Sequence, residues 1–109
     1  MRVAVANNNG TVSSHFRMCE TYRLVDVEDG KIVNSQDVPL PEYQPGTLPK
    51  FVKDQGAEVV IAGGMGPNAV QLFDSLGVQV ILGVSGDIET VVEAFAKGEL
   101  VAGDSTCTH

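Results

Sequence analysis

Two short segments near opposite ends of the chain carry every cysteine and histidine. His15 and Cys19 are four residues apart in "SSHFRMC", and Cys107 and His109 are two apart in the closing "GDSTCTH". A spacing of four places two side chains on the same side of a helical turn, and a spacing of two does so in an extended segment. The two thiols and two imidazoles together suit tetrahedral zinc, iron or a metal–sulfur species.

The same residues have plainer interpretations. Cys19 as a small buried side chain, His15 as an exposed polar one and a flexible tail over residues 103–109 would also account for the pattern, because chain ends usually fray. Pairing of Cys19 with Cys107 on oxidation would make a thiol switch, which requires the tail to dock at disulfide distance. The proposed four-ligand metal site therefore depends on whether the tail folds back over the first segment.

Two glycine-rich segments, "GGMGPN" (63–68) and "GVSGD" (83–87), each lead from an expected strand into an expected helix. Backbone N–H groups at helix starts bind anions, and ligands of α/β proteins gather at the carboxyl ends of strands. Neither segment matches the G-x-G-x-x-G or P-loop pattern. The glycines form either a rim that binds a ligand or only tight turns, and Met65 either faces a soft metal or fills a gap in the packing.

Composition indicates one domain over residues 1–109, since a chain of 109 residues with 43% apolar content can bury a core without metal or disulfide support. Two cysteines are too few for a disulfide framework. No apolar run approaches the roughly 20 residues that span a bilayer, and no signal peptide is recognisable, so we expect a cytoplasmic protein without membrane contact. A net charge of −7 and the lack of a Lys/Arg run argue against nucleic-acid partners.

The first half of the chain predicts strands. Residues 2–6, 21–27 and 31–38 are short and β-branched, and the Asp-Gly pair between the last two predicts a hairpin. Four prolines in Val38–Pro49 predict a loop of about a dozen residues.

The second half predicts alternating helices and strands. Thr47 is a candidate N-cap for a helix that ends before Gly56, and residues 58–62 and 78–82 are short apolar runs typical of buried parallel strands. Two further helices are indicated by apolar spacing, with Ala69, Leu72, Phe73 and Leu76 on one and Ile88, Val91, Val92 and Phe95 on the other. The prediction is an α/β fold with a mixed sheet of about five strands in the order β-β-β-α-β-α-β-α.

Three stretches resemble, in order and over nearly the whole chain, the dinitrogenase iron–molybdenum cofactor biosynthesis family. They are "VSSHFRMCETYRLVDVEDGKI", "GAEVVIAGGMGPNAVQLFDSLGVQVILGVSGDIETVVEAFAKGEL" and the C-x-H tail. Members typically carry S-x-HF, then a glycine and a basic residue, and often a cysteine. "SSHF" and Cys19 fit this pattern, whereas Arg17 stands at the usual glycine.

The resemblance implies a ribonuclease H-like fold and a small standalone protein that binds or carries an iron–molybdenum cofactor, a precursor or another metal–sulfur cluster. A cofactor-assembly or target protein is the implied partner. Arg17 is either an electrostatic contact for an anionic cluster or a solvated side chain. The implied binding residues are Ser14, His15, Phe16 and Cys19, with Gly63, Gly64 and Met65 on a neighbouring rim.

A catalytic role is not expected. A nuclease of this shape needs clustered carboxylates for magnesium, typically with one on the first strand, and Asn7 in "VAVANNN" cannot supply one. Neither a nucleophile elbow nor an HExxH motif is present. The alternative from another class is a metal-free interaction or regulatory module that uses the glycine rim to bind an anion or a protein.

Overall fold

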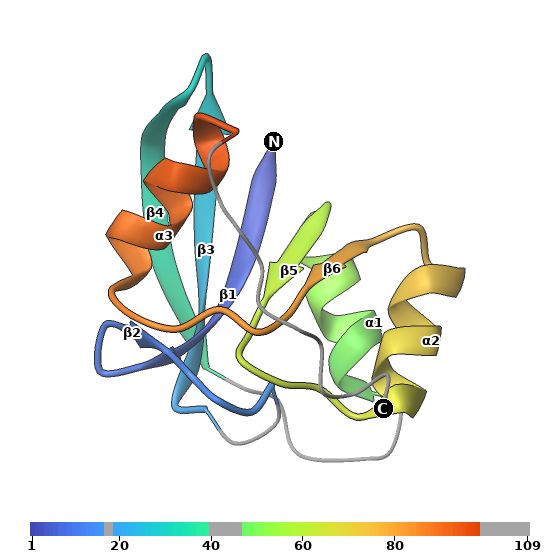
Figure 1. The fold of residues 1–109 in the computed structure, drawn as a ribbon. Helices are drawn as coiled ribbons and strands as arrows, with labels where there is room; N and C mark the ends of the chain where they lie inside the picture. The colour runs from blue at the N-terminus through green and yellow to red at the C-terminus, as the bar shows by residue number, and fades with distance from the viewer. Residues whose placement is uncertain (17–18, 40–46, 99–109) are drawn as a thin grey trace.

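The computed structural model describes residues 1–16, 19–39 and 47–98 and shows an α/β fold (Figure 1). In chain order the elements are β1 (Arg2–Asn8), β2 (Thr11–Val12), β3 (Thr21–Glu28), β4 (Lys31–Pro39), α1 (Thr47–Asp54), β5 (Val59–Ile61), α2 (Pro67–Ser75), β6 (Gln79–Ile81) and α3 (Ile88–Ala96). Apart from β2, this is the predicted succession of strands and helices. None of the helices in the described ranges is long and apolar enough to cross a membrane.

The strands form one mixed sheet in the spatial order β4-β3-β1-β5-β6, and β2 pairs only with the end of β1. The pairs β1–β3, β3–β4 and β1–β2 are antiparallel, whereas β1, β5 and β6 run parallel. A mixed sheet is therefore confirmed, with six strands among the described residues instead of about five. The ribonuclease H-like label stays a prediction.

Two hairpin turns explain the first half of the sheet. Asp29 and Gly30, with φ of 52° and 76°, turn the chain between β3 and β4 and confirm the predicted hairpin. Asn9 and Gly10, with φ of 53° and 88°, make the same kind of turn and pair β2 with the end of β1. Two successive residues at positive φ match the twist of paired strands, and Asn-Gly and Asp-Gly favour that geometry. The sequence analysis missed β2 because it read this turn only as a loop.

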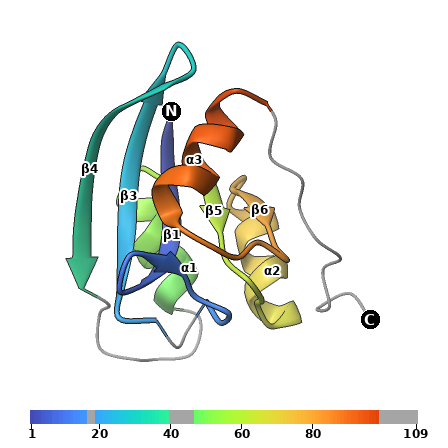
Figure 2. The same ribbon diagram turned by 60° about the vertical axis from the view of Figure 1, so that its left-hand side comes forward.

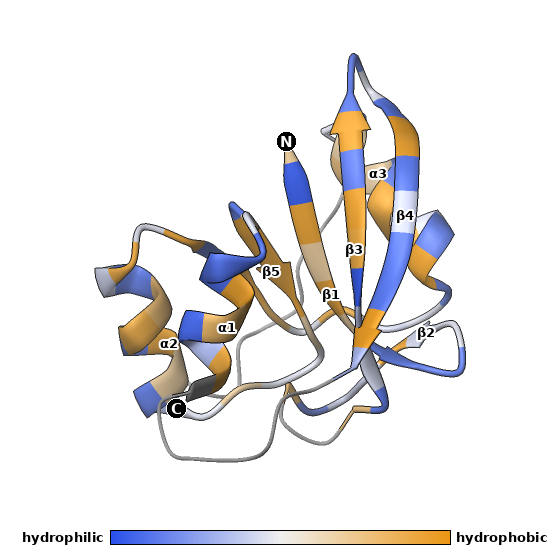
Figure 3. Ribbon diagram, turned by 180° about the vertical axis from the view of Figure 1, so that it is seen from behind, coloured by the Kyte–Doolittle hydropathy of each residue, from blue (hydrophilic) through white to orange (hydrophobic). Residues whose placement is uncertain are grey.

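The helices cover both faces of the sheet: α1 and α2 lie on one face, and α3 lies on the other (Figures 1 and 2). Strand β1 is the centre of the sheet, and its side chains alternate between the two layers. Ala4 and Ala6 pack in the cluster with α1 and α2, whereas Val3 and Val5 pack in the cluster with α3. Figure 3 shows polar and apolar residues alternating along β3.

Three sequence expectations need comment. Thr47 is the first residue of α1 instead of its N-cap. Leu72 is 39% exposed and does not share the buried face of Ala69 and Phe73, so that part of the apolar assignment of α2 was wrong. Most of the proline-rich segment, residues 40–46, lies outside the described residues.

Candidate functional site

The carboxyl ends of the three parallel strands meet at one edge of the sheet, the lower edge in Figure 1, where α2 and α3 also begin. Backbone hydrogen bonds join the loops there. Gly83 donates its N–H to the carbonyl of Gly63 at 3.0 Å, and Ile88 donates to the carbonyl of Gly10 at 3.0 Å. This edge is where α/β folds usually bind ligands.

The segment Ser13–Phe16 is fastened to the first glycine segment. Gly63 donates its N–H to the carbonyl of Ser13 at 2.8 Å, and Phe16 donates to the carbonyl of Gly64 at 2.9 Å. A Cβ on Gly63 would lie 2.8 Å from Cα of Ser14, and one on Gly64 would lie 3.0 Å from the Ser14 carbonyl oxygen. The structure therefore brings the two predicted segments together, and this contact requires glycine at both positions.

Ser13 is a supporting residue that the sequence analysis missed, since nothing in "SS" distinguishes it from Ser14. Its hydroxyl is buried, donates to the carbonyl of His15 at 2.9 Å and accepts the N–H of the same residue at 3.2 Å. The side-chain amide of Asn8 also donates to this hydroxyl at 3.1 Å. Ser13 therefore fixes the turn that holds the exposed side chains of Ser14 and His15.

Phe16 packs its side chain into the core. It is 1% exposed, stacks on the ring of Tyr22 with centroids 5.1 Å apart and meets the edge of Phe73 at 5.3 Å. Met65 is 6% exposed and belongs to the same apolar cluster, which favours its packing role. These side chains support the loop from below, so Phe16 and Met65 can offer a ligand only their backbone groups.

Cys19 is half-buried against this apolar cluster, and its thiol donates to the carbonyl of Phe16 at 3.4 Å. Burial raises the pKa of the Cys19 thiol to about 11, although backbone hydrogen bonds oppose the shift. The thiol is therefore protonated at neutral pH. Residues 14–16 and 19 are not helical, so the spacing of four does not by itself turn Cys19 and His15 the same way.

Arg17, Cys107 and His109 lie outside the described residues, so the predicted contribution of the tail is not tested. Within the ranges that the structure describes, no three side chains among His, Cys, Asp and Glu gather closely enough to hold a metal ion. In this part of the chain, His15 is the exposed metal-ligating side chain and Cys19 is the partly covered one.

The two helix starts at this edge differ in charge. In α3 the Asp87 side chain caps the helix by accepting the N–H of Thr90 at 3.1 Å, and Glu89 adds a carboxylate in the first turn. In α2 the N-cap is Gly66, which makes no side-chain cap, and the first turn has no acidic residue. The positive end of the helix dipole is thus compensated in α3 and left available in α2, two residues beyond Gly64.

These features define a small α/β domain with an exposed, backbone-fastened loop where its parallel strands end. The sequence model of the family described as "Dinitrogenase iron-molybdenum cofactor" matches residues 1–98, and the chain belongs to this family.

Similar proteins agree over most of the length. The solved structure of the protein PH0822 is 39% identical with a TM-score of 0.86, and the match covers 94% of this chain and 96% of the other. The apo form of the orange protein from Desulfovibrio gigas shares the fold at 21% identity, with a TM-score of 0.77 and coverage of 95% and 93%. Uncharacterized protein MJ0580 of Methanocaldococcus jannaschii is 27% identical over 105 residues, with coverage of 92% and 89%.

Proposed function

We propose that the protein binds and carries an iron–molybdenum cofactor, a precursor of it or another metal–sulfur cluster, and that it catalyses no reaction. Family membership supports a role related to this cofactor. The observation that carries the proposal is the exposed His15, held on a fastened loop beside the uncapped start of α2. A ribonuclease H-like classification of the fold belongs to the same proposal.

The geometry suits an anionic cluster as cargo. The imidazole of His15 supplies a nitrogen ligand for a metal at the edge of the cluster. Because Ser13 and the two glycines already fix the loop, binding costs little additional ordering of the backbone. The start of α2 favours negative charge locally, which offsets part of the repulsion expected from a chain with a net charge of −7.

Cys19 is the second ligand in this proposal, and it must lose its proton to bind. With a pKa raised to about 11, its thiol gives up the proton only when a metal replaces it, so cluster affinity should rise with pH. Binding also requires the thiol to leave its hydrogen bond with the carbonyl of Phe16. Cys107 and His109 would complete a set of four ligands if the tail reaches this edge.

The absence of catalysis is proposed from the first strand. Asn7 is 5% exposed, its side-chain amide donates to the hydroxyl of Thr21 at 2.8 Å, and its side-chain oxygen accepts the N–H of Gly10 at 2.8 Å. These contacts give Asn7 a structural role in the Asn-Gly turn. A cytoplasmic location and a cofactor-assembly or target protein as the recipient complete the proposal.

The test is anaerobic reconstitution of the protein with iron, sulfide and molybdate, followed by metal analysis and a visible spectrum. We expect stoichiometric metal in the wild-type protein and its loss in His15→Ala. Gln79→Ala, an exposed polar change on β6 away from the loop, is the matched control and should load normally. Zinc and iron alone are tested in parallel, and deletion of residues 107–109 tests the tail.

Two results would count against the proposal. If the folded wild-type protein retains no metal after reconstitution, the carrier role is wrong and the metal-free interaction module takes its place. If His15→Ala loads as well as the wild type while Cys19→Ala or the tail deletion does not, the carrier role stands but the ligand assignment does not. Circular dichroism of each variant separates loss of binding from loss of folding.

A further inference from the structure

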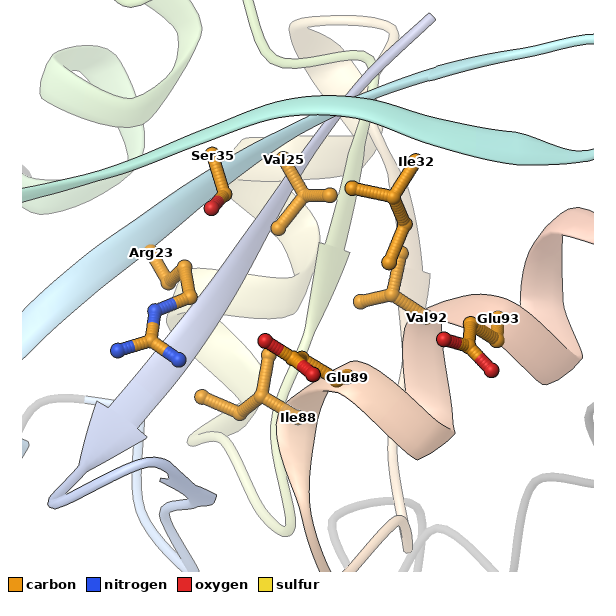
Figure 4. Close-up of a pocket in the computed structure, with 8 residues that line it drawn as sticks. All are labelled: Arg23, Val25, Ile32, Ser35, Ile88, Glu89, Val92 and Glu93. Carbon is orange, nitrogen blue, oxygen red and sulfur yellow. The ribbon is translucent and has the colours of Figure 1, made fainter.

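A pocket of about 210 Å³ lies between α3 and the β3–β4 hairpin, on the face of the sheet opposite α1 and α2 (Figure 4). Four apolar side chains form its inner wall, and three of them are almost fully buried. They are Val25 from β3, Ile32 from β4, and Ile88 and Val92 from α3. The volume equals that of about seven water molecules at liquid density, which is room for a chain of four or five carbon atoms.

The mouth of this pocket is lined by charged side chains. Glu89 and Glu93 are four residues apart on α3, which puts both carboxylates on the side of the helix that faces the hairpin. In Figure 4 the carboxylate of Glu89 stands in the pocket, with Arg23 on one side and Glu93 on the other. Both glutamates are exposed, so their charges remain hydrated and are cheap to keep.

The positive charge of Arg23 is already committed to Asp37. Nε of Arg23 donates to Oδ1 of Asp37 at 2.7 Å, and Nη2 donates to Oδ2 at 3.3 Å. This two-pronged pair spans β3 and β4 and neutralises the guanidinium at the edge of the pocket. Glu89 and Glu93 have no ion pair with any residue in the part of the chain that the structure describes. The mouth therefore carries a local charge of about −2, which opposes anions.

We propose that this pocket binds a primary alkylammonium group, with the aliphatic chain against Val25, Ile88 and Val92 and the ammonium between Glu89 and Glu93. An ammonium has three donors for these carboxylates, and the Ser35 hydroxyl at the pocket wall offers a further acceptor. The same chemistry is presented by a free aliphatic amine and by a lysine side chain on a partner protein. This site is separate from the loop of His15 and needs no metal cargo.

The test is a titration of the ¹⁵N-labelled full chain with n-butylammonium chloride, followed by NMR at constant ionic strength. We expect saturable shifts confined to the signals of Ile32, Ile88 and Val92. Because each buried methylene adds affinity, n-butylammonium should bind about tenfold more tightly than ethylammonium. n-Butanol tests the need for charge, and equal binding of the alcohol would overturn the proposal, as would shifts that do not saturate.

Variants test the assignment of the two carboxylates. The double change Glu89→Gln/Glu93→Gln should weaken n-butylammonium binding about fivefold or more, since it removes both partners of the cation. Asp54→Asn/Glu58→Gln alters net charge equally at exposed positions away from the pocket and should bind as the wild type does. Equal weakening in both double variants would overturn the proposal, because it would show a general charge effect.

Two further probes distinguish the sources. Binding of N-acetyl-lysine N-methylamide as tight as that of n-butylammonium supports a lysine side chain of a partner protein. Its exclusion, together with tight binding of 1,5-diaminopentane, supports a free amine. Failure of both probes to compete with n-butylammonium overturns the assignment of this pocket to alkylammonium ligands.

Discussion

The contact between Gly63 and Ser14 gives a sharp test of how the candidate loop is held. In Gly63→Ala the new Cβ would lie 2.8 Å from Cα of Ser14 and 3.1 Å from the carbonyl oxygen of Ser13. Both neighbours are backbone atoms, so no flexible side chain can move aside. Gly63 does not have a positive φ, and alanine therefore meets a steric conflict instead of a backbone one.

The expected cost follows from what must move. Displacing the loop costs about 1–3 kcal/mol as an overpacking change. It also weakens the hydrogen bonds from Gly63 to Ser13 and from Phe16 to Gly64, worth about 1 kcal/mol each. The lower entropy of the unfolded alanine chain returns about 0.4–1 kcal/mol. We expect a net loss of about 1–3 kcal/mol in the free energy of unfolding.

Gly66→Ala is the matched control, because a Cβ there meets nothing within 4 Å and its φ is −67°. A weaker helix cap and a stiffer unfolded chain should nearly cancel, leaving stability within about 0.5 kcal/mol of the wild type. Urea unfolding measures both variants, and amide NMR signals of Ser14 to Phe16 report the loop. If Gly63→Ala is as stable as Gly66→Ala with unshifted loop signals, the tight contact is wrong.

Three further predictions concern residues around the same edge. Phe16→Ala should cost about 3–5 kcal/mol by urea unfolding, because it leaves a cavity between Tyr22 and Phe73, whereas His15→Ala should change stability by less than about 0.5 kcal/mol; equal costs would contradict the assignment of the two side chains. In a Cys107→Ser background, Cys19 should react with iodoacetamide at pH 7.5 about tenfold or more slowly than in the urea-unfolded chain, since burial raises its pKa from 9.0 to about 11. The same shift stabilises the fold below pH 9.0 and loses this contribution as pH rises through about 11, so Cys19→Ala should flatten that part of the stability curve. Asp87→Ala should cost about 1 kcal/mol in thermal unfolding by removing the cap on Thr90, and Asp87→Asn should recover most of it.

Local chemistry was enough to predict much of the fold. The Asp-Gly turn, the short apolar runs and the helical spacing before Gly98 all depend on neighbours in sequence, and their strands and helices are present. The extra strand β2 was missed because its two residues have no pattern of their own. Their pairing follows from the conformation of Asn9 and Gly10, which a loop signal does not specify.

The candidate site was harder to predict because its contacts join distant parts of the chain. Phe16 stands among polar residues without periodicity, and its burial is decided by Tyr22 on β3 and Phe73 on α2. The covered thiol of Cys19 depends on the same cluster. Sequence resemblance found which segments meet, whereas the division between exposed His15 and the buried Phe16 side chain required the packed structure.

The central position of β1 bears on how the chain folds during synthesis. β1 can pair with β3 and β4 once residues 2–39 have left the ribosome, but its other edge waits for residues 59–61 of β5. Until then the nascent chain presents an unpaired, apolar edge along Val3–Ala6, the kind of edge that recruits strands from other chains. We expect fragments that end before β5 to aggregate and to need a chaperone, and fragments that include it to remain dispersed.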